Sequence, residues 1–529
     1  MPEMTSGRPF ESSLMELPWL RVVDKSGTPR ACNLQEFFLT APEINRLDGE
    51  LPTQDAAVLR FLVALVLVAV ADEEMDESAA LERWTEWWED WSALADIVLV
   101  YIEKHRDEFD LLHPEQPFLQ HAELEPAGKL EPGLGRLIPD VSQWFSTRDA
   151  ARPMTLDEAP RWMLQAQGFS VAGIHTGQKG DDTVTGGRGY PNGFPAWLGN
   201  LGLVLWHGEN LAQTILLNLP LGMCMNAKRA GWQMDRPLNS VREGFSPTLA
   251  ELLVWPSRRL KLHVDPGGMI RTVQVSYGDM ITPYNLNWCE PMSAWRRSEA
   301  QSKKAKHDVM MPVRHDPSKQ VWRGLGSVLS RGDGRQRPAT ATWLDELVTS
   351  GALDASMPVR MQIVGMEYGP QNSSVDTIVD DSLVAPLVAL TADSLVRTED
   401  AAVSLAAKGV GALTLLATHL AVATGMPEEP ARARAAQAGY AAIDPWFRAW
   451  MLTLTDPDAT GDYVVSWHRA LRRALLQRGQ EQIAAAGPAA VRGRKVDGRL
   501  VNSATAWASF HAKVCALTPE ANHSKESQE

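Results

Sequence analysis

The sequence predicts two parts: a region of mixed strands and helices over residues 1–380, and a helical bundle over residues 381–517. Before residue 380, strand patterns and helix patterns alternate, as they do over 16–38. After residue 380, apolar residues recur only at helical spacing, in segments separated by Gly, Pro and Asp. These segments predict four or five helices: 382–396, 400–424, 431–453, 460–486 and 502–517. Residues 518–529 are expected to be disordered.

Composition indicates a soluble globular protein of more than one domain, with 529 residues, 44% hydrophobic and 22% charged. The net charge of −14 argues against nucleic-acid binding by the whole surface. Residues 396–529, however, carry 15 Lys and Arg against 13 Asp and Glu, so any such contact would use local patches. The apolar run Phe61–Ala71 is too short to span a membrane. The N-terminus lacks a signal-peptide pattern and the four cysteines are scattered, which fits a cytoplasmic protein.

In chain order, residues 16–38 read as two strands and a helix start, with Asn33 and Glu36 spaced as a capping box. Residues 55–71 form an apolar helix. Four tryptophans follow at the spacing of one helix face, which favours core packing over base stacking: Trp84, Trp87, Trp88 and Trp91. Residues 131–159 form a long loop that carries Phe145.

Seven glycines lie between Ile174 and Gly199, a density that neither a helix nor a central strand tolerates. The segment is therefore a loop whose backbone can approach another molecule closely. Lys179 and Arg188 add two cations, which suits a phosphate backbone. A mobile surface loop without any partner is the alternative. Because such a loop packs against little, we expect a substitution at Gly187 to leave the fold nearly untouched.

The stretch after this loop predicts a strand over 201–206, a helix from 213 to 219 and strands within 250–278. Residues 358–377 read as two strands joined by a polar turn at Tyr368–Asn372. Between the strands predicted within 250–278 and those of 358–377, residues 296–323 form a basic, loop-like insertion. It contains two His-Asp pairs, His307–Asp308 and His315–Asp316. Such pairs bind metal in some phosphohydrolases, so a metal-dependent nuclease is an alternative function. The insertion lacks the further ligands that this chemistry needs, and the chain contains neither GxSxG nor HExxH.

Basic residues of the predicted bundle gather in two runs, which form either a solvated face or contacts to a nucleic-acid backbone: Arg469, Arg472, Arg473 and Arg478, then Arg492, Arg494, Lys495 and Arg499. An interaction scaffold that binds only protein through its tryptophan-rich faces is a further alternative.

The order of these features resembles the CasA family, the large subunit of the type I-E CRISPR surveillance complex Cascade. The resemblance covers nearly the whole chain and rests on the glycine loop, the predicted bundle and five short stretches: Trp19–Val22, Asn33–Glu36, His113–Gln120, Thr214–Asn218 and Tyr368–Ser373. It implies an α+β domain over 1–380 and a four-helix bundle over 381–517. It also implies a non-catalytic protein whose partners are other Cascade subunits, CRISPR RNA, double-stranded target DNA and a helicase-nuclease.

The resemblance also implies site residues. Glycine-loop residues would read a short flanking motif in the DNA minor groove: Gly177, Lys179, Gly180, Gly186, Gly187, Arg188 and Gly189. Gln371 and Asn372 would form a wedge that splits the first base pair, and Phe145 would dock on the guide RNA end. Six cations would contact the non-target strand or backbone: Arg469, Arg472, Arg473, Arg492, Arg494 and Lys495. We expect no cofactor and no metal. The family's supporting lysine falls near Asp279, so either the alignment slips at this point or Lys179 or Arg188 takes that role.

Overall fold

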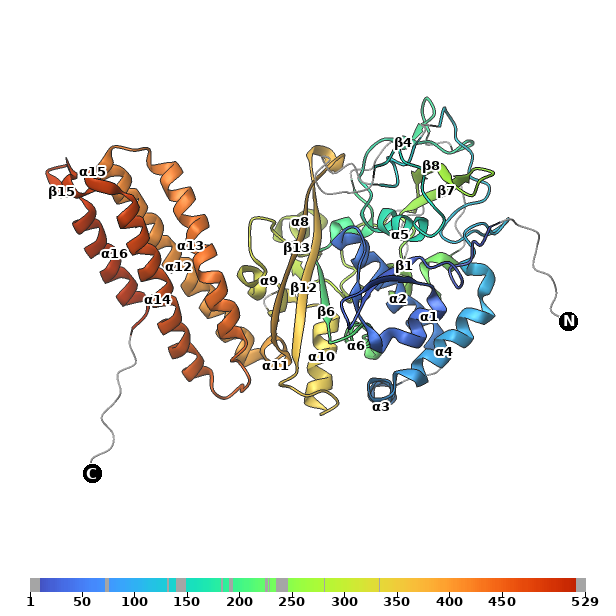
Figure 1. Cartoon of the computed structure of the whole chain (residues 1–529), viewed down its shortest axis with the longest axis horizontal. Helices are drawn as coiled ribbons and strands as arrows, with labels where there is room; N and C mark the ends of the chain where they lie inside the picture. Colours follow the sequence, from blue (N-terminus) through green and yellow to red (C-terminus); the bar gives the residue numbers. More distant parts are fainter. Residues whose placement is uncertain are drawn as a thin grey trace. The chain divides into compact units, whose positions relative to one another are not determined.

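The computed structural model describes residues 10–71, 76–130, 133–138, 149–181, 184–189, 194–223, 227, 229–234, 246–279, 281–332 and 334–519. It is a mixed helix and strand structure with a helical C-terminal region (Figure 1). The chain divides into two compact units. Unit 1 comprises 1–318, 331–352 and 360–382, and unit 2 comprises 319–330, 353–359 and 383–529. Unit 2 thus takes in two segments that lie before the predicted boundary at 380.

Unit 1 begins with a three-stranded sheet in the order β2-β1-β3. Its strands are β1 (Leu20–Asp24), β2 (Pro29–Cys32) and β3 (Ile44–Leu47). Helix α1 (Leu34–Thr40) follows β2, and Asn33 and Glu36 form the predicted capping box at its start. The side chain of Asn33 accepts a hydrogen bond from the Glu36 backbone N–H at 2.8 Å, so the expected helix start is confirmed.

Helix α2 (Pro52–Val70) is the centre of unit 1, and nearly every one of its side chains is buried. It packs against α4 (Trp91–Lys104), α5 (Ala159–Phe169) and α7 (Leu249–Leu253). By length and composition alone, α2 and α12 (Asp393–Thr424) could each cross a membrane. The apolar window of α2 is 89% buried inside the protein, as expected of a core helix, and that of α12 is 44% buried.

The tryptophan row lies on two helices rather than on one face of a single helix. Helix α3 (Glu77–Glu89) ends before Asp90, and the Asp90 carboxylate caps the next helix by accepting from Ser92 N–H at 3.0 Å. Trp91 therefore begins α4. Trp84 is fully buried and its indole N–H donates to the Leu216 carbonyl at 2.9 Å. The favoured interpretation, packing in a core, is confirmed for this tryptophan.

A second sheet carries the predicted polar turn. Its strands are ordered β13-β12-β6, with β6 at Leu203–His207, β12 at Pro358–Tyr368 and β13 at Val375–Pro386. Helix α6 (Leu211–Leu217) follows β6, and α10 (Ala339–Thr349) precedes β12. The helix expected over 382–396 is wrong at its start, because β13 continues to Pro386 before α11 (Leu387–Thr391).

The segment expected to be a basic loop contains regular structure instead. Strand β9 (Trp295–Arg297) leads into α8 (Glu299–Ala305) and returns as β10 (Met310–Pro312), and β11 (Arg335–Gln336) completes a sheet in the order β10-β9-β11. Before it, β7 (Arg258–Val264) and β8 (Ile270–Tyr277) form an antiparallel hairpin. Helix α7 precedes this hairpin, where the sequence predicted only strands.

Unit 2 is built on α12, which packs against α13 (Glu428–Met451), α14 (Thr460–Ala485), α16 (Ser503–Leu517) and the short α9 (Leu325–Leu329). The region is not purely helical. After α15 (Gly487–Arg492), β14 (Arg494–Val496) and β15 (Arg499–Val501) form an antiparallel hairpin. Asp497 and Gly498 both have positive φ at its turn, which is the usual signature of a two-residue hairpin.

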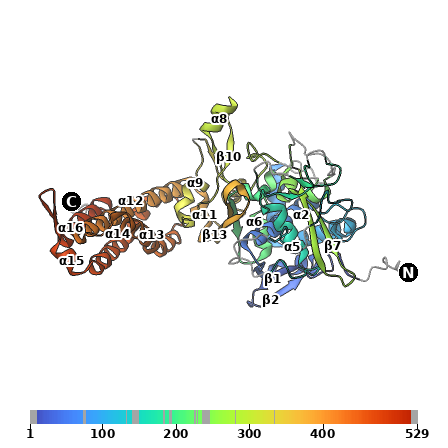
Figure 2. The same ribbon diagram turned by 90° about the horizontal axis from the view of Figure 1, so that it is seen from above.

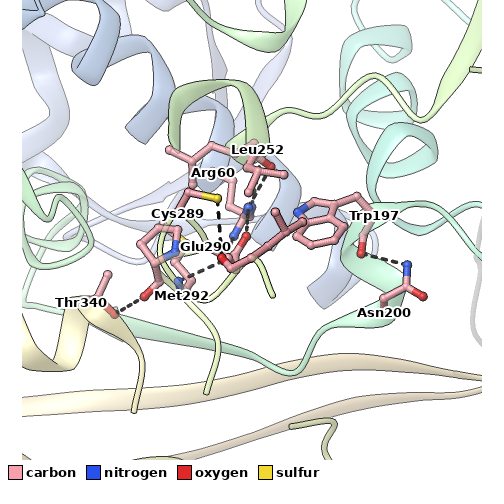
Figure 3. A network of polar contacts seen from close by, with 11 residues as sticks. Arg60, Trp197, Asn200, Leu252, Cys289, Glu290, Met292 and Thr340 are labelled. Atoms are coloured by element: carbon pink, nitrogen blue, oxygen red, sulfur yellow. Dashed lines mark hydrogen bonds and ion pairs between the residues drawn. The ribbon is translucent and has the colours of Figure 1, made fainter. Parts of the chain in front are cut away.

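A buried ion pair ties α2 to the loop before β9 (Figure 3). Arg60 and Glu290 have no exposed side-chain surface and meet in a bidentate contact at 2.9 and 2.8 Å. The same guanidinium donates to the backbone carbonyls of Leu252 and Leu253, at 3.0 and 3.2 Å. Glu290 also accepts the Met292 N–H at 3.0 Å. One arginine thus holds three separate segments of unit 1 together.

Candidate nucleic-acid interface

The glycine loop is closed at its base by two short paired strands. In β4 (His175–Thr176) and β5 (Arg188–Gly189), His175 lies opposite Gly189 and Thr176 opposite Arg188. Beyond this pair, the Gly177 N–H donates to the Gly187 carbonyl at 3.0 Å. Gly186 and Gly187 have φ of +59° and +77°, a region that favours glycine, so this end of the loop depends on their lack of a Cβ.

The loop packs on the backbone of residues 125–128, so the expectation that it packs against little is wrong. The Gly177 carbonyl accepts the Ala127 N–H at 2.8 Å, and Lys179 N–H donates to the Glu125 carbonyl at 2.9 Å. A Cβ at Gly187 would lie 2.9 Å from the Gly128 Cα, too close without backbone movement. At Gly186 and Gly180, by contrast, a Cβ would meet no atom within 4 Å. These two glycines therefore form the open surface of the loop.

The two predicted cations of the loop differ in their surroundings. The Lys179 ammonium lies 2.8 Å from the Glu125 carboxylate, and this exposed pair raises the pKa of Lys179 and lowers that of Glu125. Its charge is therefore partly balanced within the protein. The Arg188 side chain is exposed, and within the described ranges it makes no ion pair. Of the two loop cations, Arg188 is therefore the one whose charge is not balanced by an ion pair with another described residue.

Beneath the loop lies a buried group that sequence reasoning missed. Arg258 is 2% exposed and donates to the carbonyls of Ser170 and Val171, at 3.1 and 2.9 Å. Its guanidinium lies 5.2 Å from the centre of the Tyr277 ring, and that ring contacts His175 edge-on. Burial lowers the pKa of Arg258 to about 10, and burial and the Arg258 charge lower the pKa of His175, which is therefore neutral. The group anchors the strand that enters the loop.

The polar turn lies at the end of β12 and β13, where Pro370–Asn372 form one short 3-10 turn. Gln371 and Asn372 both have left-handed backbones, with φ of +59° and +54°. The Gln371 side chain is exposed at the tip. Asn372 is less exposed, and its carbonyl accepts the Ala172 N–H at 2.7 Å. Of the two predicted wedge residues, Gln371 is the one that presents its side chain to solvent.

The Ala172–Asn372 hydrogen bond brings two distant predicted elements together. Ala172 lies three residues before β4, so the turn and the base of the glycine loop are neighbours in unit 1. A cavity of about 390 Å³ lies here, and its lining includes Phe169 and Val171, His175 of the loop base, and Ser373 and Ser374 of the turn. Nothing in the spacing of the sequence alone predicts this neighbourhood, because about 200 residues separate its parts.

The two His-Asp pairs do not converge on a common site. The Asp308 carboxylate contacts Arg297 at 2.8 Å, and His307 Nδ1 faces the Asp308 carbonyl. His315 is half-buried, with its Nε2 2.8 Å from the Leu203 carbonyl oxygen, and desolvation lowers its pKa to about 4. Asp316 accepts from Ser318 in a local turn. Among the described residues, no cluster of three or more His, Cys, Asp or Glu could hold a metal ion.

The predicted cations of unit 2 fall into two groups. On α14, Arg469 is exposed, Arg473 lies over the Trp446 ring at 5.3 Å, and Arg472 is half-buried. Arg492 is the last residue of α15, and Arg494 and Lys495 lie on β14; all three are exposed. Phe145, the predicted contact to guide RNA, lies outside the described residues.

Comparison with known proteins identifies a family over most of the chain. The family model for CRISPR-associated protein Cse1 matches residues 13–478. A CRISPR-associated protein CasA/Cse1 from Thermus thermophilus is 26% identical over 335 residues, which span 61% of this chain and 61% of that relative.

Solved structures share the fold. Cse1 of Thermobifida fusca is 33% identical with a TM-score of 0.86, covering 96% of this chain and 98% of that one. Cse1 of Acidimicrobium ferrooxidans is 23% identical with a TM-score of 0.79, covering 97% and 98%. A chain of a structure described as a CRISPR RNA-guided surveillance complex is 17% identical, with a TM-score of 0.60 and coverage of 95% and 99%.

Proposed function

The chain belongs to the Cse1 family of CRISPR-associated proteins, and from this premise we propose that it is the non-catalytic large subunit of an RNA-guided, Cascade-type surveillance complex. Its task would be to recognise a short motif in double-stranded DNA and to begin strand opening beside it. The observation that carries this proposal is the pairing of an open glycine loop with an exposed glutamine turn, joined through Ala172 and Asn372. In this view base pairing with the guide reads the target sequence, and the protein reads only the flanking motif.

The glycine loop supports minor-groove reading by its backbone. Gly180 and Gly186 present open surface without a Cβ, which permits close approach to the floor of a narrow groove. A phosphate contact by Arg188 is supported by its exposure, and its charge is not balanced by an ion pair in the described part of the chain. Lys179 would first have to leave Glu125, so we assign the supporting role to Arg188.

The turn supports the wedge role through Gln371. Its side chain stands at the tip of two long strands, and the strained left-handed backbone of the tip is fixed by hydrogen bonds within the turn and by Ala172. A rigid support is what a wedge needs, because holding a base pair apart costs a few kcal/mol. Asn372 supports the turn rather than contacting DNA.

The remaining assignments follow from family membership. We propose that the partners are the other subunits, CRISPR RNA and a helicase-nuclease, and that Phe145 contacts the guide RNA end. We assign α12, α13, α14 and α16 to a four-helix bundle whose exposed cations contact the non-target strand or backbone. We place the protein in the cytoplasm. No observation favours the nuclease alternative, because the His-Asp pairs are engaged elsewhere.

The proposal is tested by assembling the guide-loaded complex with and without this chain. We expect binding of a motif-bearing duplex to require the chain, and a pre-opened bubble with the same sequence to bind without it. Equal duplex binding in both preparations would contradict the proposal. Cleavage of DNA by the chain alone in Mg²⁺ or Mn²⁺, abolished by His307→Ala, would favour the nuclease instead.

A further inference from the structure

One tryptophan departs from the others in its exposure. Trp288 is 56% exposed, whereas every other tryptophan in the described ranges is buried or half-buried. A single exposed apolar side chain is normal on a protein surface, so the exposure of Trp288 gains meaning only from the residues around it. Leu286, two residues before it, and Cys289, the next residue, are buried, so the turn that carries Trp288 is anchored in the core on both sides.

Trp288 lies beside the basic strand-and-helix insertion. The Gln336 side chain of β11 makes two hydrogen bonds to Asn287: it accepts from the Asn287 side-chain amide at 2.7 Å and donates to the Asn287 backbone carbonyl at 3.0 Å. Gln336 follows Arg335, and Arg335 is the register partner of Arg296 on β9. The exposed ring and the basic sheet β10-β9-β11 are therefore fixed to each other by the fold of unit 1.

The insertion is basic in a chain that is acidic overall. Residues 295–316, the part of this segment that contains β9, α8 and β10, carry six Lys and Arg against three Asp and Glu, whereas the whole chain carries 51 against 65. Arg296 is exposed and makes no ion pair within the described ranges. Lys303 and Lys304 lie in the last turn of α8, and Lys306 caps it with a left-handed backbone. Figure 2 shows α8 and β10 standing out from the ribbon of unit 1.

The insertion is also connected to the strand that ends at the polar turn. The Met292 carbonyl accepts the Val204 N–H at 2.8 Å, so the chain leaving Trp288 lines the β6 edge of the sheet. After β10, Arg314 donates to the Met366 carbonyl of β12 at 2.8 Å. The basic insertion and the Gln371 turn are thus parts of one connected framework.

We propose that Trp288 and the insertion form a landing site for single-stranded DNA, the strand displaced when a duplex opens at the turn. One unpaired base stacks on the Trp288 indole, and phosphates contact Arg296 and the lysines of α8. An exposed aromatic ring beside exposed cations is the combination that binds single strands without sequence preference. The identity of the strand rests on the proposed function, which supplies an opened duplex.

Two other occupants fit this surface less well. The bases of a closed duplex are stacked on one another and offer no face to Trp288. The centre of a protein interface is depleted of lysine, whereas this surface carries Lys303, Lys304 and Lys306 around its helix.

The test uses the full-length chain and a fluorescein-labelled single-stranded DNA of mixed sequence, about 12 nucleotides long, a length within the usual range of such sites. Anisotropy is measured over a series of salt concentrations. Trp288→Ala should weaken binding about tenfold, within the roughly 5- to 150-fold range of one stacking interaction, and Trp288→Phe should restore most of the loss. Lys303→Gln with Lys304→Gln should instead reduce the salt slope, by about 0.7 for each phosphate that the variant no longer neutralises.

Leu39→Ala is the matched control, because Leu39 is an exposed apolar side chain of unit 1 outside the insertion. It should leave binding unchanged, and all variants should keep the wild-type melting temperature. Single-strand binding by Trp288→Ala within twofold of wild type would overturn the proposal, as would the absence of single-strand binding by the wild type at low salt. Loss of complex assembly without loss of DNA binding would also overturn it and would indicate a protein partner.

A second readout separates this inference from the proposed function. A single-stranded DNA carrying 5-bromouracil should crosslink to the peptide that contains Trp288, and a crosslink confined to other peptides would count against the site. Motif preference is measured on the assembled complex with Trp288 intact. If that preference is absent while the crosslink forms, the proposed function fails and the single-strand site stands.

Discussion

Replacing Arg60 by Met should destabilise unit 1 far more than an average substitution does. The change removes a bidentate contact to Glu290 and the donors to Leu252 and Leu253, and it leaves a carboxylate in a place with no solvent exposure. Breaking a buried ion pair from one side costs about 3–5 kcal/mol, because the remaining charge is uncompensated. Met keeps much of the arginine stem volume, so the destabilisation reports mainly on charge and hydrogen bonds.

The structure also predicts how the double variant behaves. Arg60→Met with Glu290→Leu removes both charges and leaves only neutral backbone groups without partners, namely two carbonyls and the Met292 N–H. Each unsatisfied neutral group costs about 1–3 kcal/mol, so the double variant remains less stable than wild type. Its cost should nevertheless fall below the sum of the two single costs by about 0.5–3 kcal/mol, the usual coupling between residues in contact.

Hydrogen exchange followed by mass spectrometry tests this prediction, because it reports the free energy of opening separately for each unit. Separate values are needed because a chain of two units need not unfold in one step. In Arg60→Met, peptides of α2 should exchange faster at their slowest amides, while peptides of α12 and α14 serve as the internal control. A cost below about 1 kcal/mol in α2, well under the range for a buried pair, would refute the reasoning, and so would additive single costs.

Three further outcomes follow from local geometry. Gly187→Ala should destabilise the glycine loop and speed amide hydrogen exchange in the loop, whereas Gly186→Ala should cost only the left-handed backbone penalty of about 1–2 kcal/mol. Equal effects of the two variants would show that the contact between Gly187 and Gly128 is unimportant. Gln371→Gly, which suits the positive φ of the tip, should keep motif docking but reduce permanganate reactivity of the first unpaired bases; unchanged reactivity would remove the wedge assignment. Burial raises the pKa of Asp55 to about 7, so the folded state holds a proton that the unfolded state releases near pH 4. Stability from this group is therefore lost as pH rises from about 4 to 7, and Asp55→Asn should flatten the fall in melting temperature over that window; an unchanged slope would contradict the assignment.

Strong local signals allowed the sequence to predict several elements. The Asn33 capping box, the apolar helix α2 and the paired strands β12 and β13 all depend on neighbouring residues, and each formed close to where it was expected. Two misjudged signals were also local. Asp90 begins a new helix before Trp91, and Asp497-Gly498 is a typical two-residue hairpin turn inside a region assigned only to helices.

The remaining features of the candidate site depend on contacts between distant residues. Glu125 pairs with Lys179 from 54 residues away and partly balances its charge, and Gly128 restricts Gly187 although nothing in the glycine loop itself indicates it. The exposure of Trp288 is likewise a property of the folded chain. The sequence contains eighteen other tryptophans, and none of those that the structure describes is as exposed. The sequence could therefore indicate a glycine loop and a polar turn, but not that Ala172 joins them.

The most direct measurement of the central claim compares Gly186→Asp with Gly186→Asn in the assembled complex. Gly186 is open and left-handed, and Asn and Asp both tolerate that backbone, so the two variants differ in charge alone. Binding is measured for a motif duplex, a scrambled-motif duplex and a bubble. We predict that Gly186→Asp loses the preference for the motif duplex by about 1–3 kcal/mol, the usual cost of one mismatched position. Gly186→Asn should keep most of that preference, and all variants should bind the bubble. Full discrimination by Gly186→Asp would contradict the claim that this loop reads DNA.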